Sequence, residues 1–239
     1  MISLQSMNTH TNENERRRTV RSFVLRKGRM TKAQDACLQT LWPEYGICCA
    51  SDELLDVAAL FKREAPTVLE IGFGTGHTLI QMALQNPAMN FIGIEVFQTG
   101  IATLLAEIKK NSVTNLRLLH GDAIDFLTHN IPDASLSIIQ LFFPDPWQKT
   151  RHHKRRIVQP SFVSLVSEKL ITNGIFHLAT DWENYATHIL DVMTAKPEFK
   201  KLDAETSAKK TLNRLVTKFE NRGTQLGYAI FDFAFLLQA

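Results

Sequence analysis

The stretch Val68-Leu69-Glu70-Ile71-Gly72-Phe73-Gly74-Thr75-Gly76 joins a short apolar run to a turn of alternating glycines. The apolar run predicts a buried strand, and the spacing of apolar residues from Thr78 to Leu84 predicts a helix directly after the turn. Glycines in such a turn permit positive φ angles and let a ligand approach the backbone closely. The spacing Gly-x-Gly-x-Gly differs from the Gly-x-Gly-x-x-Gly of nicotinamide and flavin folds, and no Gly-Lys-Ser/Thr of a P-loop follows. The stretch therefore predicts a ligand-binding strand–turn–helix unit of another kind.

The same alternation of strand-like and helix-like segments continues along the chain. Further strands are expected at 91–95, 116–119, 136–143 and 174–179, and further helices at 101–108, 124–127, 157–170 and 182–193. Repeated strand–helix pairs predict parallel strands, helices on both faces and ligands at the carboxyl ends of the strands. Two later β-like segments, 212–219 and 228–237, flank a glycine-containing loop and predict an antiparallel hairpin. The expected fold class is α/β, with a Rossmann-like, doubly wound, mostly parallel seven-stranded sheet that ends in that hairpin.

The N-terminal part of the chain differs from the rest in composition. Residues 1–30 are predicted to form a basic, flexible arm, and residues 31–239 a single domain that begins with helices. One helix is expected from Thr31 to Trp42-Pro43, and a second is expected to be capped by residues 51–53 and to run to Phe61. The N-terminal basic cluster contains no acid and consists of Arg16, Arg17, Arg18, Arg21, Arg26, Lys27, Arg29 and Lys32.

Composition also bounds the location of the protein. Of the 239 residues, 44% are hydrophobic, which suffices for a full core. No apolar run approaches the roughly 18 residues that a membrane span needs, and the polar start lacks the apolar region of a secretory signal. We therefore expect a cytoplasmic protein with no membrane partner. The three cysteines, Cys37, Cys48 and Cys49, are expected to be reduced, and their spacing does not suggest a metal site.

Three acids follow the predicted strands where a ligand would lie. Glu70 ends the first strand, Glu95 ends the second about 20 residues beyond the glycine loop, and Asp122 follows the third. An acid at the second position can accept hydrogen bonds from ribose hydroxyls. Three carboxylates do not suit a pyrophosphate, but they suit a nucleoside that carries positive charge. S-adenosylmethionine is such a ligand, and this arrangement resembles the class I methyltransferase fold.

The run Phe142-Phe143-Pro144-Asp145-Pro146-Trp147-Gln148-Lys149-Thr150-Arg151-His152-His153-Lys154-Arg155-Arg156 places a rigid acid before a dense cationic cluster. The prolines fix φ and remove two backbone donors, so the turn is stiff. The two basic clusters of the chain favour a nucleic-acid partner. The turn resembles the Asp/Asn-Pro-Pro-Tyr/Trp turn of amino-group methyltransferases, with an Asp inserted between the prolines.

The longer run resembles the bacterial tRNA (guanine-N7-)-methyltransferase family. Other motifs share the resemblance, namely Arg21-Ser22-Phe23-Val24, Trp42-Pro43, Thr180-Asp181-Trp182 and Thr217-Lys218-Phe219-Glu220-Asn221-Arg222-Gly223. The resemblance implies transfer of the methyl group of S-adenosylmethionine to N7 of guanine 46 in the tRNA variable loop. Residues that depart from the family pattern are His77, Phe97, Thr150, Gln225 and Tyr228.

Roles for individual residues follow from the strand ends and from the resemblance. The cofactor is expected to contact Glu70, Gly72, Gly74, Gly76, Glu95, Asp122 and Asp145. The resemblance implies substrate contacts at Lys149, Arg151, Lys154, Arg155, Asp181, Thr217, Lys218, Phe219 and Glu220, with the RNA meeting the whole run 151–156. Guanine N7 carries a lone pair and no proton, so its methylation needs no strong general base. The catalytic residue is expected to be Asp145, which would orient the guanine.

Two other functions remain open at this point. Pro-Asp-Pro-Trp also suits an amino-group methyltransferase that acts on another nucleic acid or on a protein. A non-catalytic RNA-binding protein could keep the same fold, although the four acids argue against it. A nicotinamide dehydrogenase is disfavoured by the glycine spacing. The sequence leaves monomer and homodimer open, and it predicts no metal.

Overall fold

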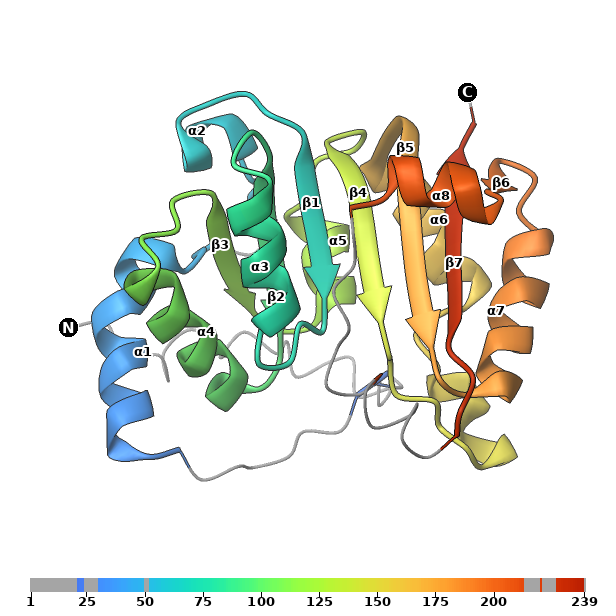
Figure 1. Cartoon of the computed structure of the whole chain (residues 1–239), viewed down its shortest axis with the longest axis horizontal. Helices are drawn as coiled ribbons and strands as arrows, with labels where there is room; N and C mark the ends of the chain where they lie inside the picture. Colours follow the sequence, from blue (N-terminus) through green and yellow to red (C-terminus); the bar gives the residue numbers. More distant parts are fainter. Residues whose placement is uncertain (1–20, 24–29, 50–51, 213–219, 221–226, 239) are drawn as a thin grey trace.

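The computed structural model describes residues 21–23, 30–49, 52–212, 220 and 227–238. These residues form one seven-stranded sheet (Figure 1). Its strands are β1 (Thr67–Ile71), β2 (Asn90–Glu95), β3 (Leu116–His120), β4 (Leu136–Phe142), β5 (Leu170–Thr180), β6 (Phe199–Lys201) and β7 (Phe231–Leu237). The order across the sheet is β3-β2-β1-β4-β5-β7-β6. The first five strands run parallel, and β7 runs antiparallel to both β5 and β6. This confirms the predicted Rossmann-like, mostly parallel sheet with an antiparallel end.

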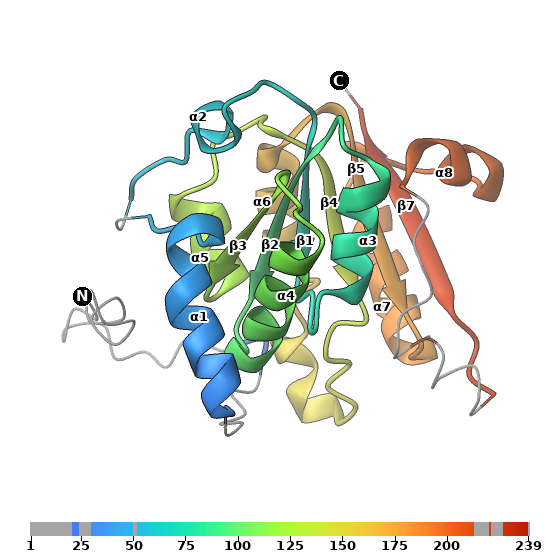
Figure 2. The same cartoon turned by 60° about the vertical axis from the view of Figure 1, so that its left-hand side comes forward.

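Helices cover both faces of the sheet, as strand–helix alternation requires. The helices are α1 (Lys32–Tyr45), α2 (Val57–Phe61), α3 (His77–Gln85), α4 (Gln98–Lys110), α5 (Ala123–His129), α6 (Pro160–Lys169), α7 (Glu183–Thr194) and α8 (Ala204–Lys210). In Figures 1 and 2, α1, α3 and α4 lie on one face of the sheet, and α5, α6 and α7 lie on the other. Val68 packs into the first of these layers and Leu69 into the second, and both are fully buried. Successive strand residues point to opposite faces, so a strand that is apolar throughout must be covered on both sides.

Both predicted N-terminal helices form, but with different bounds. Thr31 caps α1 in a capping box with Gln34, and the helix continues past Pro43 to Tyr45. The second helix is corrected, because α2 begins only after Asp56, whose side chain accepts from the amide of Ala59 at 2.9 Å. Leu54, which lies within the predicted helix, is outside α2 and is 62% exposed. Of the predicted arm, residues 1–30, only 21–23 and 30 belong to the described residues.

The antiparallel end of the sheet also differs from the prediction. β7 lies within the predicted segment 228–237, and its partners among the described residues are β5 and β6. Of residues 212–219 only Leu212 is described, and it is not in a strand. β6 has three residues and buries only Phe199, so it leaves almost no alternation to detect in the sequence. Element boundaries shift elsewhere as well: for example, α6 starts at Pro160 rather than at 157, and β5 starts at Leu170 rather than at 174.

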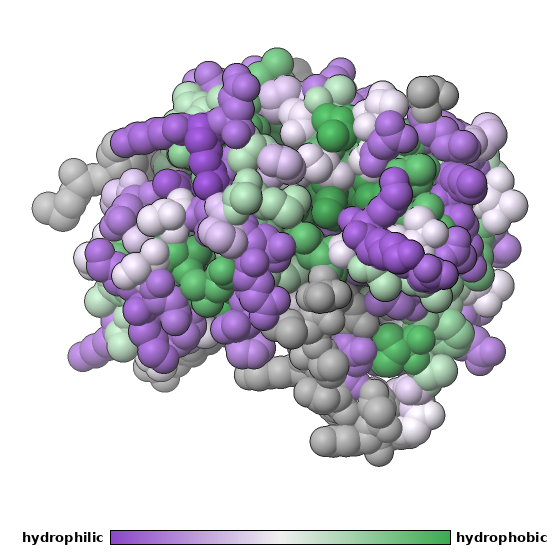
Figure 3. Space-filling model, turned by 45° about the horizontal axis from the view of Figure 1, so that its top comes forward, coloured by the Kyte–Doolittle hydropathy of each residue, from purple (hydrophilic) through white to green (hydrophobic). Residues whose placement is uncertain are grey.

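The amino ends of the parallel strands face the top of Figure 1, which Figure 3 brings forward. Hydrophilic residues cover most of the surface there, with hydrophobic ones gathered in smaller areas between them. None of the described helices combines the length and the apolar character that crossing a membrane would require. Ligands of parallel sheets bind at the opposite, carboxyl end of the strands.

Candidate active site

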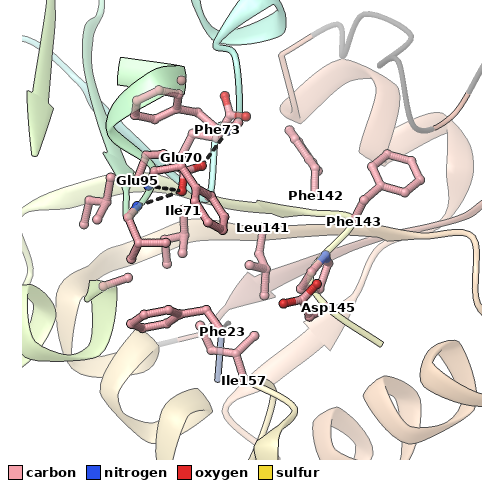
Figure 4. A pocket seen from close by; sticks show the side chains of 18 of the residues that line it. Phe23, Glu70, Ile71, Phe73, Glu95, Leu141, Phe142, Phe143, Asp145 and Ile157 are labelled. Atoms are coloured by element: carbon pink, nitrogen blue, oxygen red, sulfur yellow. Dashed lines mark hydrogen bonds between the residues drawn. The ribbon is translucent and has the colours of Figure 1, made fainter. Parts of the chain in front are cut away.

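A cavity of about 770 Å³ opens at the carboxyl ends of the parallel strands. It brings together four of the predicted acids, since Glu70, Glu95, Asp122 and Asp145 all line it. Figure 4 shows Glu70 and Glu95 on one side of the cavity and Asp145 on another, with Phe23 and Ile157 below. The acids come from four different segments because the carboxyl ends of neighbouring parallel strands converge at this edge.

Glu70 is a buried carboxyl group near the end of β1. Its side chain is 4% exposed, and its Oε2 atom has no hydrogen-bond partner among the described residues. Burial, and next the nearby Glu95, raise the pKa of Glu70 to about 8. A buried polar atom without a partner is costly, and a cation placed in the cavity would favour the charged form of this carboxyl group.

Glu95 ends β2 and holds the glycine loop. Its Oε2 accepts a hydrogen bond from the amide of Gly74 at 2.7 Å, and its Oε1 accepts from the amides of Val96 at 2.7 Å and Phe97 at 3.1 Å. Burial raises the pKa of Glu95, and these backbone hydrogen bonds oppose that rise. A carboxylate offers about four acceptor positions, so one is left for a ligand in this arrangement. Glu95 therefore shapes the cavity as well as lining it.

The three glycines of the loop have different roles. Gly72 and Gly74 line the cavity at φ angles of 74° and 60°, and a Cβ atom at either would meet nothing within 4 Å. Gly76 has a φ of 72° but does not line the cavity, and a Cβ there would lie 2.4 Å from the side chain of Leu104. The first two glycines thus leave room for a ligand, whereas Gly76 allows α3 to begin close to α4.

A fourth glycine, in α4, was not identified from the sequence. A Cβ atom on Gly100 would lie 2.0 Å from the carbonyl oxygen of Gly74, so α4 supports the glycine loop directly. Gly100 also lines the cavity. An isolated glycine inside a helical pattern signals only a lowered helix propensity, and the contact spans residues far apart in the sequence.

Asp122 both caps a helix and lines the cavity. It is the N-cap of α5, and its Oδ1 accepts from the amide of Ile124 at 3.0 Å. Burial raises the pKa of its carboxyl group, and this hydrogen bond opposes that rise. Because Asp122 also lines the cavity, its remaining acceptor positions can serve a ligand.

Asp145 sits on a turn with unusual backbone geometry. Phe143 and Trp147, on either side of Pro144-Asp145-Pro146, have φ angles of 50° and 43°. Non-glycine residues rarely adopt this left-handed region. The turn directs Asp145 to the cavity, and the prolines contribute no backbone donors around it.

Trp147 packs against other parts of the protein. Its Nε1 donates to the carbonyl of Ser22 at 2.9 Å, and the guanidinium of Arg155 lies 4.0 Å from the ring centroid. The Nε of Arg155 also donates to the carbonyl of Arg21 at 3.3 Å. These contacts hold Ser22 and Phe23 against the cavity, which both residues line. Phe23 belongs to one of the motifs of the resemblance, but nothing local in the sequence predicts its place in this wall.

The cationic run forms a 3₁₀ helix, η2 (Thr150–Arg155). Lys149, Arg151 and Lys154 are exposed, and Arg155 is half-buried. Arg156, by contrast, is only 2% exposed, although the resemblance implied that the whole run 151–156 meets RNA.

Of the other residues that were predicted to contact the substrate, those that the structure describes are not found in the cavity wall. Asp181 follows β5 and is half-buried, but it is not among the residues that line the cavity. Glu220 is described, whereas Thr217, Lys218 and Phe219 lie outside the described residues. Within the described part of the chain, no group of three or more His, Cys, Asp or Glu side chains is arranged to hold a metal ion.

Comparisons with known proteins show which family the chain resembles. Residues 64–233 match the family model described as "Putative methyltransferase". The chain is 50% identical to a tRNA (guanine-N(7)-)-methyltransferase of Shewanella amazonensis and 52% identical to one of Aeromonas hydrophila, in each case over 91% of this chain and 92% of the relative.

Solved structures show the same fold at low identity. The 16S rRNA methyltransferase KamB has a TM-score of 0.54 and 13% identity over 82% of this chain and 99% of its own. The aminoglycoside resistance methyltransferase NpmB1 has a TM-score of 0.53 and 12% identity over 77% of this chain and 94% of its own. With half of its residues shared with curated relatives along nearly its whole length, this chain belongs to the tRNA (guanine-N(7)-)-methyltransferase family.

Proposed function

We propose that this protein transfers the methyl group of S-adenosylmethionine to N7 of guanine 46 in the variable loop of tRNA. Identity of about 50% to tRNA (guanine-N(7)-)-methyltransferases across 91% of the chain carries the proposal. The four acids that line one cavity support it. A tRNA substrate also agrees with the cytoplasmic location expected from the sequence.

The chemistry of the cavity fits the proposed cofactor. S-adenosylmethionine carries a sulfonium and an ammonium, and it supplies an activated methyl group. Glu70 offers a buried carboxyl oxygen that has no partner in the described part of the chain, and a cation would satisfy it. Gly72 and Gly74 leave open space beside the backbone, and Asp122 keeps acceptor positions available. Glu95 would hold the loop in this shape and offer its remaining acceptor position.

The acceptor needs orientation more than activation. N7 of guanine is already nucleophilic, so the barrier can be lowered mainly by holding it in line with the reacting methyl group. Asp145 would accept from N1–H or from the amino group of guanine and so fix the base. Positive charge grows on the ring as the methyl group is transferred, and a nearby carboxylate stabilises it. Asp181 would share this task from the end of β5.

A direct experiment separates this function from the alternatives. The protein is incubated with labelled S-adenosylmethionine and unmodified tRNA, and the RNA is then cleaved chemically at 7-methylguanosine. We expect cleavage at one variable-loop guanine and none in a tRNA whose guanine 46 is replaced by adenine. Label on an exocyclic amino group or on protein would contradict the proposal, and so would no incorporation at all.

The exposed cations Lys149, Arg151 and Lys154 should bind tRNA phosphates. We expect the double variant R151Q/K154Q to bind tRNA more weakly and to lower the slope of log affinity against log salt by about 0.7 to 0.9 for each phosphate that is no longer neutralised. Filter binding from low to moderate salt measures this slope. The matched control is Lys110→Gln, because Lys110 is exposed at the end of α4 and does not line the cavity. An unchanged slope in the double variant would contradict an RNA contact.

Gly100→Ala should disturb the cofactor wall without removing any polar group. The added methyl would overlap the carbonyl of Gly74, so the glycine loop must shift. Overpacking of this kind costs about 1–3 kcal/mol, and we expect the affinity for S-adenosylmethionine to fall about tenfold. Isothermal titration measures the affinity, and Thr103→Ala, on the same helix but outside the cavity wall, is the control. Wild-type affinity in Gly100→Ala would show that α4 does not support the loop.

A further inference from the structure

The prolines stiffen the turn that carries Asp145, but the turn also contains strained backbone that the rest of the protein must support. Two of its residues, Phe143 and Trp147, have left-handed backbone angles, which cost about 1–2 kcal/mol each for non-glycine residues. Pro144 and Pro146 cannot donate backbone hydrogen bonds. Such a conformation persists only where surrounding groups over-determine it.

Hydrogen bonds from three directions hold this turn. The amide of Phe143 donates to the carbonyl of Ala179 on β5 at 2.8 Å. The indole of Trp147 donates to the carbonyl of Ser22 at 2.9 Å. The Nε of Arg156 donates to the carbonyl of Pro146 at 2.9 Å. Of the three, the contact of Arg156 is made to the carbonyl of the residue that directly follows Asp145.

Arg156 is itself fixed by its surroundings. Its Nη2 donates to Oδ1 of Asn184 at 2.6 Å, and its guanidinium lies 4.8 Å from the ring centroid of Tyr185. Tyr185 is fully buried, and its hydroxyl accepts from the amide of Val158 at 3.3 Å. A planar guanidinium with several donors can hold a carbonyl and an amide oxygen at fixed positions, which an ammonium cannot do in the same way.

We propose that Arg156 is a positioning residue for methyl transfer: it holds the carbonyl of Pro146 and thereby fixes Asp145 at the cavity. It does so although it belongs to a cationic run whose other members are exposed or half-buried. The inference rests on the proposed function, because it assigns Asp145 to the methyl acceptor. Loss of Arg156 should therefore slow the reaction while tRNA and cofactor still bind.

Arg156→Lys tests this with the charge retained. In single-turnover reactions with saturating tRNA and S-adenosylmethionine, we expect the rate constant to fall about 10- to 100-fold, since a misplacement of about 1 Å costs that much. The dissociation constants for tRNA and for S-adenosylmethionine should change less than about threefold. A loss of tRNA affinity with an unchanged rate constant would mean that Arg156 binds RNA, and would overturn the proposal.

Arg63→Lys is a matched control for a merely structural effect. Arg63 also donates to two carbonyls, those of Pro87 and Met89, and to Oδ1 of Asn90, but it does not line the cavity. Both variants should lower the melting temperature. Only Arg156→Lys should lower the single-turnover rate constant, and equal loss of rate in both variants would overturn a positioning role.

Asn184→Ala provides a milder variant, because Asn184 is exposed and the change removes only one contact of Nη2 of Arg156, which still lies 3.1 Å from Nε2 of His153. It should lower the same rate constant less than Arg156→Lys does. The double variant R156K/N184A should be little slower than Arg156→Lys alone, because both changes act through one contact. Fully multiplicative effects would count against this linkage.

Amide hydrogen exchange of residues 141–149 needs no substrate and separates this proposal from the proposed function. In Arg156→Lys we expect the amides of Asp145 and Trp147 to exchange faster than in the wild type, with Arg63→Lys unchanged. If the wild-type protein failed to methylate tRNA, the proposed function would fail, but the exchange would still decide whether Arg156 holds the turn. Unchanged exchange in Arg156→Lys would overturn the inference.

Discussion

Asp145→Ala is expected to reduce the single-turnover rate of tRNA methylation by about 100-fold or more, with little change in the affinity for S-adenosylmethionine. Groups that orient the acceptor or stabilise charge in the transition state contribute about that much. Asp145 lies across the cavity from the buried Glu70, on a turn that directs it to the cavity. Rapid-quench assays at saturating tRNA and cofactor measure the rate constant.

Two further variants give this prediction its meaning. Asp145→Asn keeps an acceptor oxygen and removes the charge, so an intermediate rate would show that orientation contributes apart from charge. Asp125→Ala, in α5 outside the cavity wall, should behave as the wild type. Near-normal turnover in Asp145→Ala would show that Asp145 has no role in the methyl transfer.

Glu70→Gln is expected to have opposite effects on stability and on cofactor binding. Burial raises the pKa of Glu70 from 4.5 to about 8, so the folded protein holds this proton more tightly than the unfolded chain does. The contribution of this group to stability is therefore fully present below pH 4.5 and is lost as the pH rises towards 8. Glutamine cannot ionise, so Glu70→Gln should not lose this stability as the pH rises. The melting temperature of the variant minus that of the wild type should therefore increase by several degrees between pH 5 and 8.

The same substitution should weaken S-adenosylmethionine binding at least about tenfold at pH 8, because the ionised carboxylate that attracts the cation is gone. Between pH 6 and about 8, the wild-type affinity should rise relative to that of the variant as Glu70 ionises. Calorimetric titrations at several pH values measure this difference. The control Glu64→Gln changes an exposed acid outside the cavity. Parallel pH profiles for wild type and Glu70→Gln would show that Glu70 does not face the cationic part of the ligand.

Much of the fold could be predicted because the parallel strands carry a local signal. Val68 to Ile71 is recognisable as a strand because it is a short, mostly apolar run and the glycines mark where it ends. The structure buries every residue of this run. The start of α2 depends on whether Asp52 or Asp56 caps it, and both possibilities are compatible with the local sequence. β6 is a strand because β7 lies beside it, which no property of residues 199–201 reveals.

The residues of the candidate site also differ in whether the sequence could predict them. The four acids could be predicted because the ends of parallel strands converge, so their positions in the sequence imply their neighbourhood in space. The contact between Gly100 and Gly74, and the place of Phe23 in the wall, depend on how distant segments pack. Charge alone placed Arg156 with its neighbours in the run, and only its burial sets it apart.

β7 lies between β5 and β6 in the sheet, although it follows both of them in the chain. During synthesis, the five parallel strands can pair once Thr180 has left the ribosome, whereas β6 has no place in the sheet until Phe231–Leu237 arrive beside it. Folding that starts from the N-terminal part would therefore assemble the strand ends around the cavity first. We expect the nascent chain to acquire its ligand-binding edge before its sheet is complete, and the last strand to close the structure.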